Sequence, residues 1–263
     1  MSWNISRLRS RTAGALAAVA SLGLVLSACT SYDTYSAADA RSEAKGGVQV
    51  KAGMKAQAGP VDCEKVKCIA LTFDAGPSEH TPRLLDILKK EKVPATFFLL
   101  GKNHVDRYPE LVRRIADEGH EVANHTWSHR ILTDRSSDEV REELSRTQDA
   151  IEKLTGKRPT LMRPPQGRTD NDVSDVSREL GLAQIMWSTT AKDYSTTDSA
   201  LIEKRTLDQA GRDGIILLHD IYDGTVPAVP GIIEELKRRG YTFVTVPQLM
   251  APGHAEPGKV YKP

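Results

Sequence analysis

Two histidines four residues apart, His125 and His129, are the pair whose types and spacing most directly suggest chemistry. At that spacing two imidazoles project from the same side of a helical turn, where both can reach one divalent metal ion. Three of the chain's seven histidines, the third being His120, fall within ten residues. Asn124 and Ser128 stand beside the pair and could support metal ligands through hydrogen bonds. The pair alone fits surface or capping histidines equally well, so other residues must decide.

Further side chains of catalytic type stand at or after the ends of short apolar runs, namely Asp74, Arg163, Asp193 and His219. Such runs alternate with amphipathic segments in about seven units, which predicts a parallel sheet covered by helices. Polar residues at so many strand ends favour a barrel mouth over a single crevice. The expected strands are 69–73, 95–100, 121–123, 160–163, 183–187, 215–218 and 242–246, and the expected helices are 81–92, 109–118, 137–154, 173–180, 201–210 and 232–239.

Composition places the chain among ordinary globular proteins. It has 263 residues, of which 39% are hydrophobic and 27% charged, and its formal net charge is +1. These values fit one domain plus some non-globular sequence. No run or face of lysine and arginine stands out, so we expect no nucleic-acid partner.

The first 28 residues have the pattern of an export signal, with a basic start, an apolar run from about residue 13 to 26, and small residues after it. The sequence ending at Cys29 resembles the bacterial lipobox, in which the cysteine is lipidated. An ordinary cleaved signal or a retained membrane anchor are the alternatives, and the apolar run is short for a membrane span. We therefore expect an exported protein held at the outer face of the membrane by a lipid anchor only, or secreted.

Residues 29–60 are rich in small and polar residues, which predicts a flexible tether, followed by a folded domain over 61–250 and a C-terminal tail over 251–263. Two cysteines remain beyond the lipobox, Cys63 and Cys68. Because an exported protein meets a non-reducing environment, we expect them to form a disulfide at the start of the first strand. A thiol nucleophile is the alternative, but neither cysteine has a local basic partner beyond scattered lysines.

Five segments resemble, in order and spacing, the motifs of the NodB-type polysaccharide deacetylases, carbohydrate esterase family 4. The resemblance covers about residues 66–248, and it implies an irregular (β/α)7 barrel and metal-dependent removal of N- or O-acetyl groups from sugars. The segments are Thr72-Phe73-Asp74-Ala75-Gly76-Pro77, His125-Thr126-Trp127-Ser128-His129, Arg163-Pro164-Pro165-Gln166-Gly167, Trp187 with Asp193-Tyr194, and Leu217-Leu218-His219.

The resemblance also implies a role for each catalytic residue. His125 and His129 would be metal ligands, and Asp74 the general base that deprotonates a water activated by the metal. His219 would be the general acid that protonates the leaving amine or alkoxide, a step suited to imidazole. Arg163 and Asp193 would orient these groups.

The same resemblance implies which residues surround the acetyl group of the substrate. The backbone N–H of Gln166, between Pro165 and Gly167, would stabilise the oxyanion, while Trp187 and Leu217 would shape the pocket for the acetyl methyl group. Taken singly, the tryptophan and leucine fit ordinary core packing, and Arg163 and Asp193 fit structural ion pairs. The expected metal is zinc, with cobalt as the alternative.

The sequence departs from the family pattern at Ala75, where the family carries an aspartate that ligates the metal. A methyl group cannot ligate, which predicts weaker metal binding. Water could fill the place, Asp74 could itself turn to the metal, or another carboxylate could reach in; the candidates are Asp170, Asp172, Asp220 and Asp223. Milder departures are Gln166 for an aromatic residue and Thr190 for an aspartate.

The leading hypothesis is a metal-dependent hydrolase that removes acetyl groups from a cell-wall or extracellular polysaccharide. Peptidoglycan, chitin-like oligomers and acetylated xylan all remain as substrates, and we expect a monomer. The rival hypothesis is a catalytically impaired surface protein that binds glycans, for which Ala75 is the main support.

Overall fold

The computed structural model describes residues 32–45 and 61–263. The fold described below is that of the unit Tyr32–Pro263. The expected signal segment, the lipidation site Cys29 and residues 46–60 of the expected tether lie outside the described residues.

The described strands pair in parallel in one sheet. Their order is β1-β10-β6-β5-β4-β3-β2-β8-β7, with β9 beside β2. This path does not close on itself, so the expected (β/α)7 fold is confirmed as an incomplete, irregular barrel. The strands are β1 (Thr34–Tyr35), β2 (Lys67–Asp74), β3 (Thr96–Leu99), β4 (Glu121–Asn124), β5 (Leu161–Met162), β6 (Ala183–Ile185), β7 (Thr189–Thr190), β8 (Gly214–His219), β9 (Tyr241–Val244) and β10 (Val260–Tyr261).

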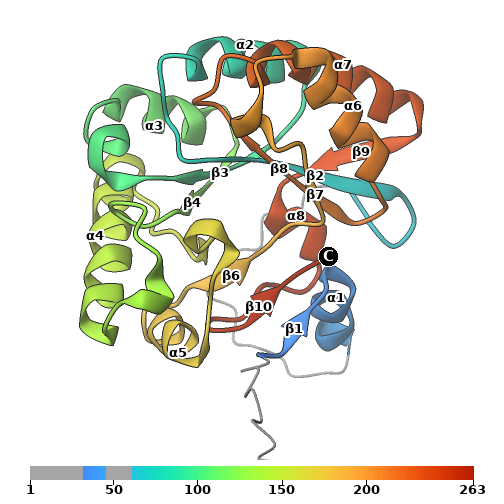
Figure 1. The fold of residues 1–263 in the computed structure, drawn as a ribbon. Helices are drawn as coiled ribbons and strands as arrows, with labels where there is room; N and C mark the ends of the chain where they lie inside the picture. Colours follow the sequence, from blue (N-terminus) through green and yellow to red (C-terminus); the bar gives the residue numbers. More distant parts are fainter. Residues whose placement is uncertain (1–31, 46–60) are drawn as a thin grey trace, which may run out of the picture. The chain divides into compact units, whose positions relative to one another are not determined.

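Helices separate most of the strands and lie around the sheet (Figure 1). The expected helices are found, but the last long helix begins at Thr225 rather than at 232. Pro227 lies in its first turn, where a proline is tolerated, and the helix continues through Pro230 in its interior. The helices are α1 (Ala37–Lys45), α2 (Thr81–Glu91), α3 (Pro109–Asp117), α4 (Ser137–Thr155), α5 (Asn171–Glu179), α6 (Ser199–Gln209), α7 (Thr225–Arg238) and α8 (Val246–Met250). None in the described ranges could cross a membrane.

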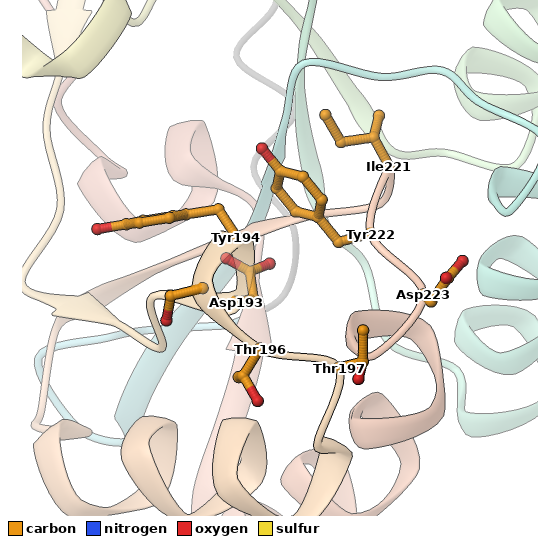
Figure 2. A pocket seen from close by; sticks show the side chains of 8 residues that line it. Asp193, Tyr194, Thr196, Thr197, Ile221, Tyr222 and Asp223 are labelled. Carbon is orange, nitrogen blue, oxygen red and sulfur yellow. The ribbon is translucent and has the colours of Figure 1, made fainter.

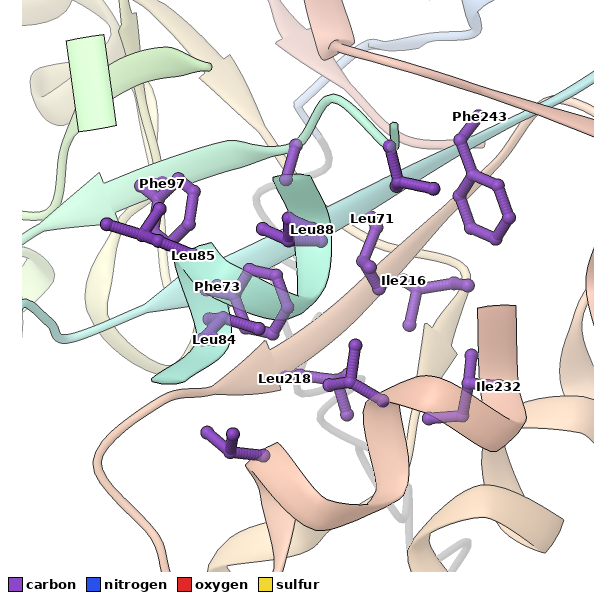
Figure 3. Packing of buried hydrophobic residues seen from close by; sticks show 14 of the residues in the cluster. Leu71, Phe73, Leu84, Leu85, Leu88, Phe97, Ile216, Leu218, Ile232 and Phe243 are labelled. Carbon is purple, nitrogen blue, oxygen red and sulfur yellow. The ribbon is translucent and has the colours of Figure 1, made fainter. Parts of the chain in front are cut away.

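Strand β2 is central, and its side chains divide between two buried faces. Ile69, Leu71 and Phe73 face outward and pack with residues of α2 and α7 in the main core (Figure 3). Thr72 and Asp74 alternate with them, so they point to the inner face, where both are buried. The alternation of the strand therefore places Asp74 inside the barrel mouth, at the carboxyl end of β2.

The sequence expectation of a tether throughout 29–60 is wrong for residues 34–45. Strand β1 pairs with β10, and helix α1 packs against α8. The helix buries only small apolar side chains, Ala37 and Ala40, which is why its composition looked like a linker. It approaches so closely that a Cβ on Gly253 would lie 1.8 Å from the Ala40 carbonyl oxygen. Arg41 is also buried and forms an ion pair of 2.6 Å with Asp213.

The expected C-terminal tail is also part of the fold. Strand β10 inserts between β1 and β6, with Tyr261 opposite Ile185. Only two residues pair, and a strand that short leaves almost no periodic signal in a sequence. Residues 251–263 therefore extend the sheet rather than trail from it.

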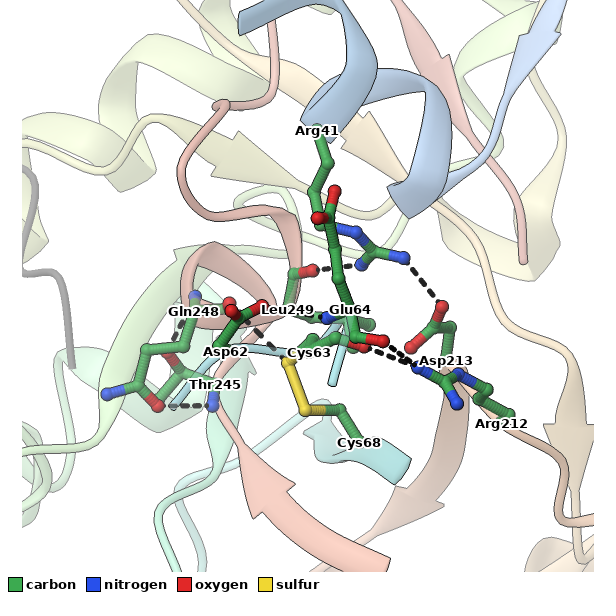
Figure 4. Close-up of a disulfide and its surroundings, with 10 residues drawn as sticks. All are labelled: Arg41, Asp62, Cys63, Glu64, Cys68, Arg212, Asp213, Thr245, Gln248 and Leu249. Carbon is green, nitrogen blue, oxygen red and sulfur yellow. Dashed lines mark hydrogen bonds and ion pairs between the residues drawn. A yellow bond between two sulfur atoms is a disulfide. The ribbon is translucent and has the colours of Figure 1, made fainter. Parts of the chain in front are cut away.

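The predicted disulfide is confirmed. Cys63 and Cys68 are bonded, with Cα atoms 5.4 Å apart, directly before and at the start of β2 (Figure 4). Arg212 donates hydrogen bonds of 2.8 Å to the carbonyl oxygens of Cys63 and Glu64. The bond and the arginine together fix the approach of the chain to the central strand.

Candidate active site

The expected base, Asp74, is held by Arg163. The Nη1 group of Arg163 donates to Asp74 Oδ1 at 2.7 Å and to the Thr72 hydroxyl oxygen at 2.8 Å. The same guanidinium donates to the carbonyl oxygens of Ile185 and Met186 at 2.9 and 3.2 Å. These contacts fix the orientation of the carboxylate and leave Oδ2 free to face the rest of the mouth.

Arg163 is fully buried, which is unusual for an arginine. Its guanidinium carbon lies 4.1 Å from the centroid of the Phe98 ring. Burial lowers the pKa of Arg163, and the charge and hydrogen bond of Asp74 act against that shift. Sequence reasoning gave roles to the arginine and the aspartate but none to Thr72 of the same motif, because a threonine inside an apolar strand carries no distinguishing signal.

His125 follows β4 and turns its Nε2 toward Asp74. Its Nδ1–H donates to the carbonyl oxygen of Arg163 at 2.7 Å, which fixes the tautomer, and Nε2 lies 3.9 Å from Asp74 Oδ2. Burial lowers the pKa of His125 to about 4, so the ring is neutral near pH 7. A neutral imidazole with an anchored Nδ1–H is the form that binds a metal ion through Nε2.

His129 lies beside His125, with ring centroids 5.0 Å apart. The expectation that the two histidines share a helical turn is wrong. The segment is a loop in which Thr126 and His129 have positive φ values of 71° and 60°, and the His129 N–H donates to the Thr126 hydroxyl oxygen at 3.1 Å. Loss of surrounding water lowers the pKa of His129, and the charge of Asp74 opposes this. The tertiary fold, not helix periodicity, brings the imidazoles together.

The histidine loop is held from outside by helix α4. Glu143 is buried and accepts hydrogen bonds from the Ser128 N–H at 2.7 Å and from the Ser128 hydroxyl at 2.5 Å. Trp127 packs against Gly101 so closely that a Cβ there would meet its ring at 2.0 Å, and Arg146 covers that ring at 3.9 Å. Sequence reasoning missed Glu143, because it is one of several glutamates on a long amphipathic helix.

The expected acid, His219, is paired with Asp193. The His219 Nδ1–H donates to Asp193 Oδ1 at 2.8 Å, while the His219 backbone N–H and the Thr225 hydroxyl donate to Oδ2 at 2.7 and 2.8 Å. Burial acts to lower the pKa of His219, but the hydrogen bond and the charge of Asp193 outweigh it, so the pKa is raised. A raised pKa keeps the ring able to donate a proton from Nε2 near neutral pH.

Ala75 lies at the end of β2 with a φ of 65°, a left-handed conformation that is unfavourable for alanine. Of the carboxylates considered as replacements for its missing ligand, Asp170 caps α5, Asp172 lies in the first turn of that helix, Asp220 bonds to Thr81, and Asp223 pairs with His80. Within residues 32–45 and 61–263, no three His, Cys, Asp or Glu side chains form a metal-holding group.

The donors at the mouth fit a divalent cation only in part. His125 offers an anchored, neutral Nε2, and His129 lies beside it, as two nitrogen ligands require. The oxygen closest to replacing the missing ligand is Asp74 Oδ2, at 3.9 Å from His125 Nε2. The chain thus offers two imidazoles and one carboxylate, Asp74, which is also the expected base. These donors carry less negative charge than a site with a second aspartate that serves only as a metal ligand.

The residues expected to surround the acetyl group come from three strand ends. Gln166 has a positive φ of 58° in the turn Pro165–Gly167, and a Cβ on Gly167 would lie 2.8 Å from the Trp187 ring. Trp187 follows β6, and its ring centroid is 5.7 Å from the Arg163 guanidinium. Leu217 is buried on β8, opposite Thr72 of β2. The turn and the tryptophan therefore lie together, and the leucine lies on the neighbouring strand.

A cavity of about 370 Å³ opens next to the Asp193–His219 pair (Figure 2). It lies between the loop after β7 and the loop after β8, and it is lined by Asp193, Tyr194, Ser195, Thr196, Thr197, Ile221, Tyr222 and Asp223. The Tyr194 and Tyr222 rings stand edge-on to His219, with centroids 6.3 and 5.5 Å from it. Tyr222 and the cavity were not foreseen from the sequence.

Fold and site together define a class: an α/β protein whose parallel strands bring an arginine-held carboxylate, two imidazoles and an aspartate–histidine pair to one mouth. The comparisons with known proteins give the family. Residues 62–185 match the family model for polysaccharide deacetylase. The chain is 36% identical over 194 residues to a Bacillus cereus peptidoglycan-N-acetylglucosamine deacetylase, covering 72% of this chain and 90% of that protein. The chain therefore belongs to the polysaccharide deacetylase family, as its motifs predicted.

Longer relatives share the same region. The Listeria monocytogenes peptidoglycan-N-acetylglucosamine deacetylase PgdA is 41% identical over 184 residues, which is 70% of this chain but 39% of that protein. A T48 deacetylase solved with substrate matches 76% of this chain and 99% of its own, at 39% identity and a TM-score of 0.73. A CE4 family pseudoenzyme from Bacillus anthracis matches 74% of this chain and 69% of its own, at 28% identity and a TM-score of 0.68.

Proposed function

We propose that this protein is a metal-dependent hydrolase that removes N-acetyl groups from amino sugars of the bacterial cell wall. One observation carries the proposal. Asp74 is held by Arg163 through Oδ1 and turns Oδ2 toward His125, while His219 is held by Asp193 at the neighbouring strand end. A base, a pair of metal ligands and an acid are thereby available at a single barrel mouth.

His125 and His129 would hold the cation, with Asp74 Oδ2 nearby. When bound, a divalent cation supplies charge that polarises the acetyl carbonyl and makes water more acidic. Asp74 takes the proton from the attacking water, and its oxygen is kept in position for this by Arg163. The Gln166 N–H would donate to the developing oxyanion, and His219 would give its Nε2 proton to the leaving nitrogen. Zinc suits the two nitrogen ligands best.

The substrate class is supported by the relatives. The Bacillus cereus protein covered to 90% and the Listeria protein are both named as peptidoglycan-N-acetylglucosamine deacetylases. The chain spans only 39% of the Listeria protein, so its own substrate remains a matter for assay. Peptidoglycan is our first choice, with chitin-like oligomers and acetylated xylan as the other substrates to test.

Export and anchoring are part of the same proposal. A signal over residues 1–28 and lipidation at Cys29 would place the domain at the outer face of the membrane, near its glycan substrate. Treatment of cells with labelled fatty acid, followed by purification of the wild type and a Cys29→Ser variant, tests this step. Label that appears in both proteins equally would contradict lipidation at this cysteine.

A second candidate function is a glycan-binding protein without turnover. Ala75 favours it, because the site then lacks the anionic ligand that both coordinates and neutralises a cation. A pseudoenzyme of known structure within the same family makes such a loss of activity a realistic outcome. The retained Asp74, Arg163, Asp193 and His219 favour the enzyme.

Acetate release decides between the two functions. The purified protein would be assayed on peptidoglycan, chitooligosaccharides and acetylxylan with added Zn²⁺ or Co²⁺, together with Asp74→Asn, His129→Ala and Ala75→Asp. We expect release by the wild type and loss of at least about 100-fold in Asp74→Asn, the range of a positioned base. His129→Ala should also lose activity, because it removes an expected metal ligand. Absence of release from every substrate at saturating metal, with glycan binding that survives His129→Ala, would support the binding protein instead.

The Ala75→Asp variant measures how much metal affinity the protein loses by carrying alanine in place of the family's aspartate at position 75. Aspartate tolerates a φ of 65° better than alanine, so the backbone should accept it without strain. We expect tighter Zn²⁺ binding by titration calorimetry. A wild type that is already active would make Ala75 an adjustment of metal affinity, whereas activity found only in Ala75→Asp would identify the natural protein as impaired.

A further inference from the structure

The loop that follows the expected base is joined to the strand end that carries the expected acid. Strands β2 and β8 pair in parallel, and their last paired residues are Asp74 and His219. Beyond that pair the two chains separate into the loop before α2 and the loop before α7. Asp220, the residue directly after the acid, continues the connection between them through its backbone and its side chain.

The connection consists of contacts between Asp220 and the loop before α2. The Ser78 hydroxyl donates to the Asp220 carbonyl oxygen at 2.6 Å, and the Thr81 hydroxyl donates to Asp220 Oδ2. The Ser78 N–H in turn donates to the Thr81 hydroxyl oxygen at 2.7 Å. The carboxyl group also packs against Gly76, where it fills the place that a Cβ atom would take. Because Ser78, Thr81 and Asp220 are buried, water competes little for these hydrogen bonds.

Other contacts of the same loop are directed elsewhere or are weaker. On the side away from the acid, backbone hydrogen bonds of 3.0 and 3.1 Å join residues 75 and 76 to residues 98 and 100 at the carboxyl end of β3. Toward the acid, His80 pairs with Asp223 at 3.3 Å, but the Asp223 side chain is 79% exposed, and such a pair contributes little. Asp220 therefore makes the stronger connection between the two loops.

The position of Asp220 is costly for a carboxyl group. Its Oδ1 atom is buried and has no hydrogen-bond partner within the described part of the chain. Burial raises the pKa of Asp220 to about 6. The Thr81 hydrogen bond and the charges of His219 and His80 act in the opposite direction. A buried polar atom without a partner lowers stability, and such exceptions are expected at functional sites, so the cost favours a role in function.

We propose that Asp220 is a positioning residue, which fixes the expected base Asp74 relative to the expected acid His219 across the acetyl group. The inference rests on the proposed function, because it assumes that these two side chains act on the same substrate group. Each must lie within hydrogen-bond reach of its own reacting atom, so the separation between them must be set. A displacement of about 1 Å lowers a rate by about 100-fold. Asp220 acts through the loop and not through contact with the substrate.

The main test compares substitutions on both sides of the connection, in the full chain loaded with Zn²⁺ and with chitotetraose as substrate. Asp220→Ala removes the carboxyl group, and Thr81→Val removes the hydroxyl group that contacts it at nearly constant volume. We expect each to lower kcat by about 10- to 100-fold and to leave KM within about threefold, because the base and acid are misaligned while sugar binding is kept. The double variant should lose little more than either single variant, because both remove one connection.

Conservative variants and a matched control separate positioning from general loss of stability. Asp220→Asn keeps an oxygen that can accept from Thr81, and Thr81→Ser keeps the hydroxyl group, so both should retain most of the wild-type kcat. Thr206→Val is the matched control, because Thr206 is also fully buried but donates to the Ile202 carbonyl oxygen of its own helix, at 2.9 Å. It should lower the free energy of unfolding in urea without lowering kcat.

A second measurement reports on the same separation without turnover. Burial acts to lower the pKa of His219, and the charge of Asp74 is among those that oppose it. That opposition weakens as the distance between the two groups grows. The His219 ring would be titrated by NMR in metal-free Asp220→Asn, alone and combined with Thr81→Val, two proteins that carry the same charges. The pKa of His219 should be lower in the combined variant.

The outcomes distinguish this proposal from the proposed function. Acetate release by the wild type, with kcat unchanged in Asp220→Ala and Thr81→Val, would overturn the positioning role while the enzyme stands. An equal fall of kcat in Thr206→Val, or a pKa of His219 that the combined variant leaves unchanged, would overturn it as well. No acetate release by the wild type from any substrate, with a lowered pKa of His219 in the combined variant, would overturn the enzyme while the link between the two side chains stands.

Discussion

Replacing Asp193 by asparagine should disable the expected acid without altering the shape of the site. Asp193 is buried and accepts three hydrogen bonds, from His219 Nδ1–H, from the His219 backbone N–H and from the Thr225 hydroxyl, at 2.7 to 2.8 Å. Asparagine has the same size but no charge, and its amide group can present a donor to Nδ1. The His219 ring would then lose the carboxylate that stabilises its doubly protonated form, which carries a proton on Nε2 for the leaving group while Nδ1–H stays bound to residue 193.

The size of the effect follows from those contacts. Exchange of a carboxylate for an amide behind a catalytic imidazole costs on the order of 10²- to 10⁴-fold in kcat. At about 1.36 kcal/mol per tenfold, this is a barrier increase of about 2.7 to 5.4 kcal/mol. The hydrogen bond and charge of Asp193 raise the pKa of His219 against the effect of burial. Removing them lowers that pKa, so the alkaline limb of the rate profile should move to lower pH.

The free energy of unfolding should also depend on the protonation of His219, and it should fall as the pH rises. The pKa of His219 is raised in the folded protein above its ordinary value of 6.5, so the folded state binds more protons in the window above pH 6.5. The stability that this gives is fully present below pH 6.5 and is lost as pH rises through the folded pKa. In Asp193→Asn this loss on raising the pH should disappear.

The assay is acetate release between pH 5 and 10 with constant metal, and urea unfolding over the same range. Asp208→Asn, at an exposed position of α6 where the carboxylate pairs with Lys204, is the matched control and should change neither measurement. An Asp193→Asn enzyme that keeps wild-type kcat and an unshifted alkaline limb would refute His219 as an acid oriented by Asp193.

Two other predictions concern residues outside the catalytic group. Glu143→Gln should weaken Co²⁺ binding by about 10- to 100-fold and alter the visible Co²⁺ spectrum, because it loosens the loop that carries the second histidine; Glu142→Gln, at an exposed position of the same helix, is the control. An unchanged spectrum would contradict this role. Arg41→Ala should lower the free energy of unfolding by about 3 kcal/mol in urea, because it leaves the partly buried Asp213 unpaired. The exposed Arg113→Ala should have no effect, and equal loss in both would remove the argument for the ion pair.

Much of the fold was readable from the sequence. The alternation of apolar runs with amphipathic segments depends on local periodicity, so seven strand–helix units and the position of α4, which is capped by Gly156, could be predicted. The pairing of Cys63 with Cys68 was also predictable. The parts that were missed, β1, α1 and β10, are short or composed of small residues, and they are stabilised by contacts with residues far away along the chain.

The residues of the candidate site could likewise be predicted from the sequence, but the contacts between them could not. Residue types and motif spacing are enough to select Asp74, Arg163, His125, Asp193 and His219, because chemistry restricts which side chains can act as base, ligand and acid. The sequence could not say which atoms meet. The distance between the aspartate and the first imidazole, and the choice of Oδ1 for the arginine, depend on strands that are far apart along the chain.

The sequence by itself determined the family, the order of the candidate catalytic residues and the absence of an aspartate at Ala75. Only the tertiary structure decided that Asp170, Asp220 and Asp223 have other partners, that Glu143 holds the histidine loop, and that Tyr222 lines a cavity beside the acid. The physical reason is that residue types and their spacing along the chain fix the local backbone geometry and the reactions that each side chain can support. Which side chains contact one another depends instead on which strand ends the sheet brings within a few ångströms of one another.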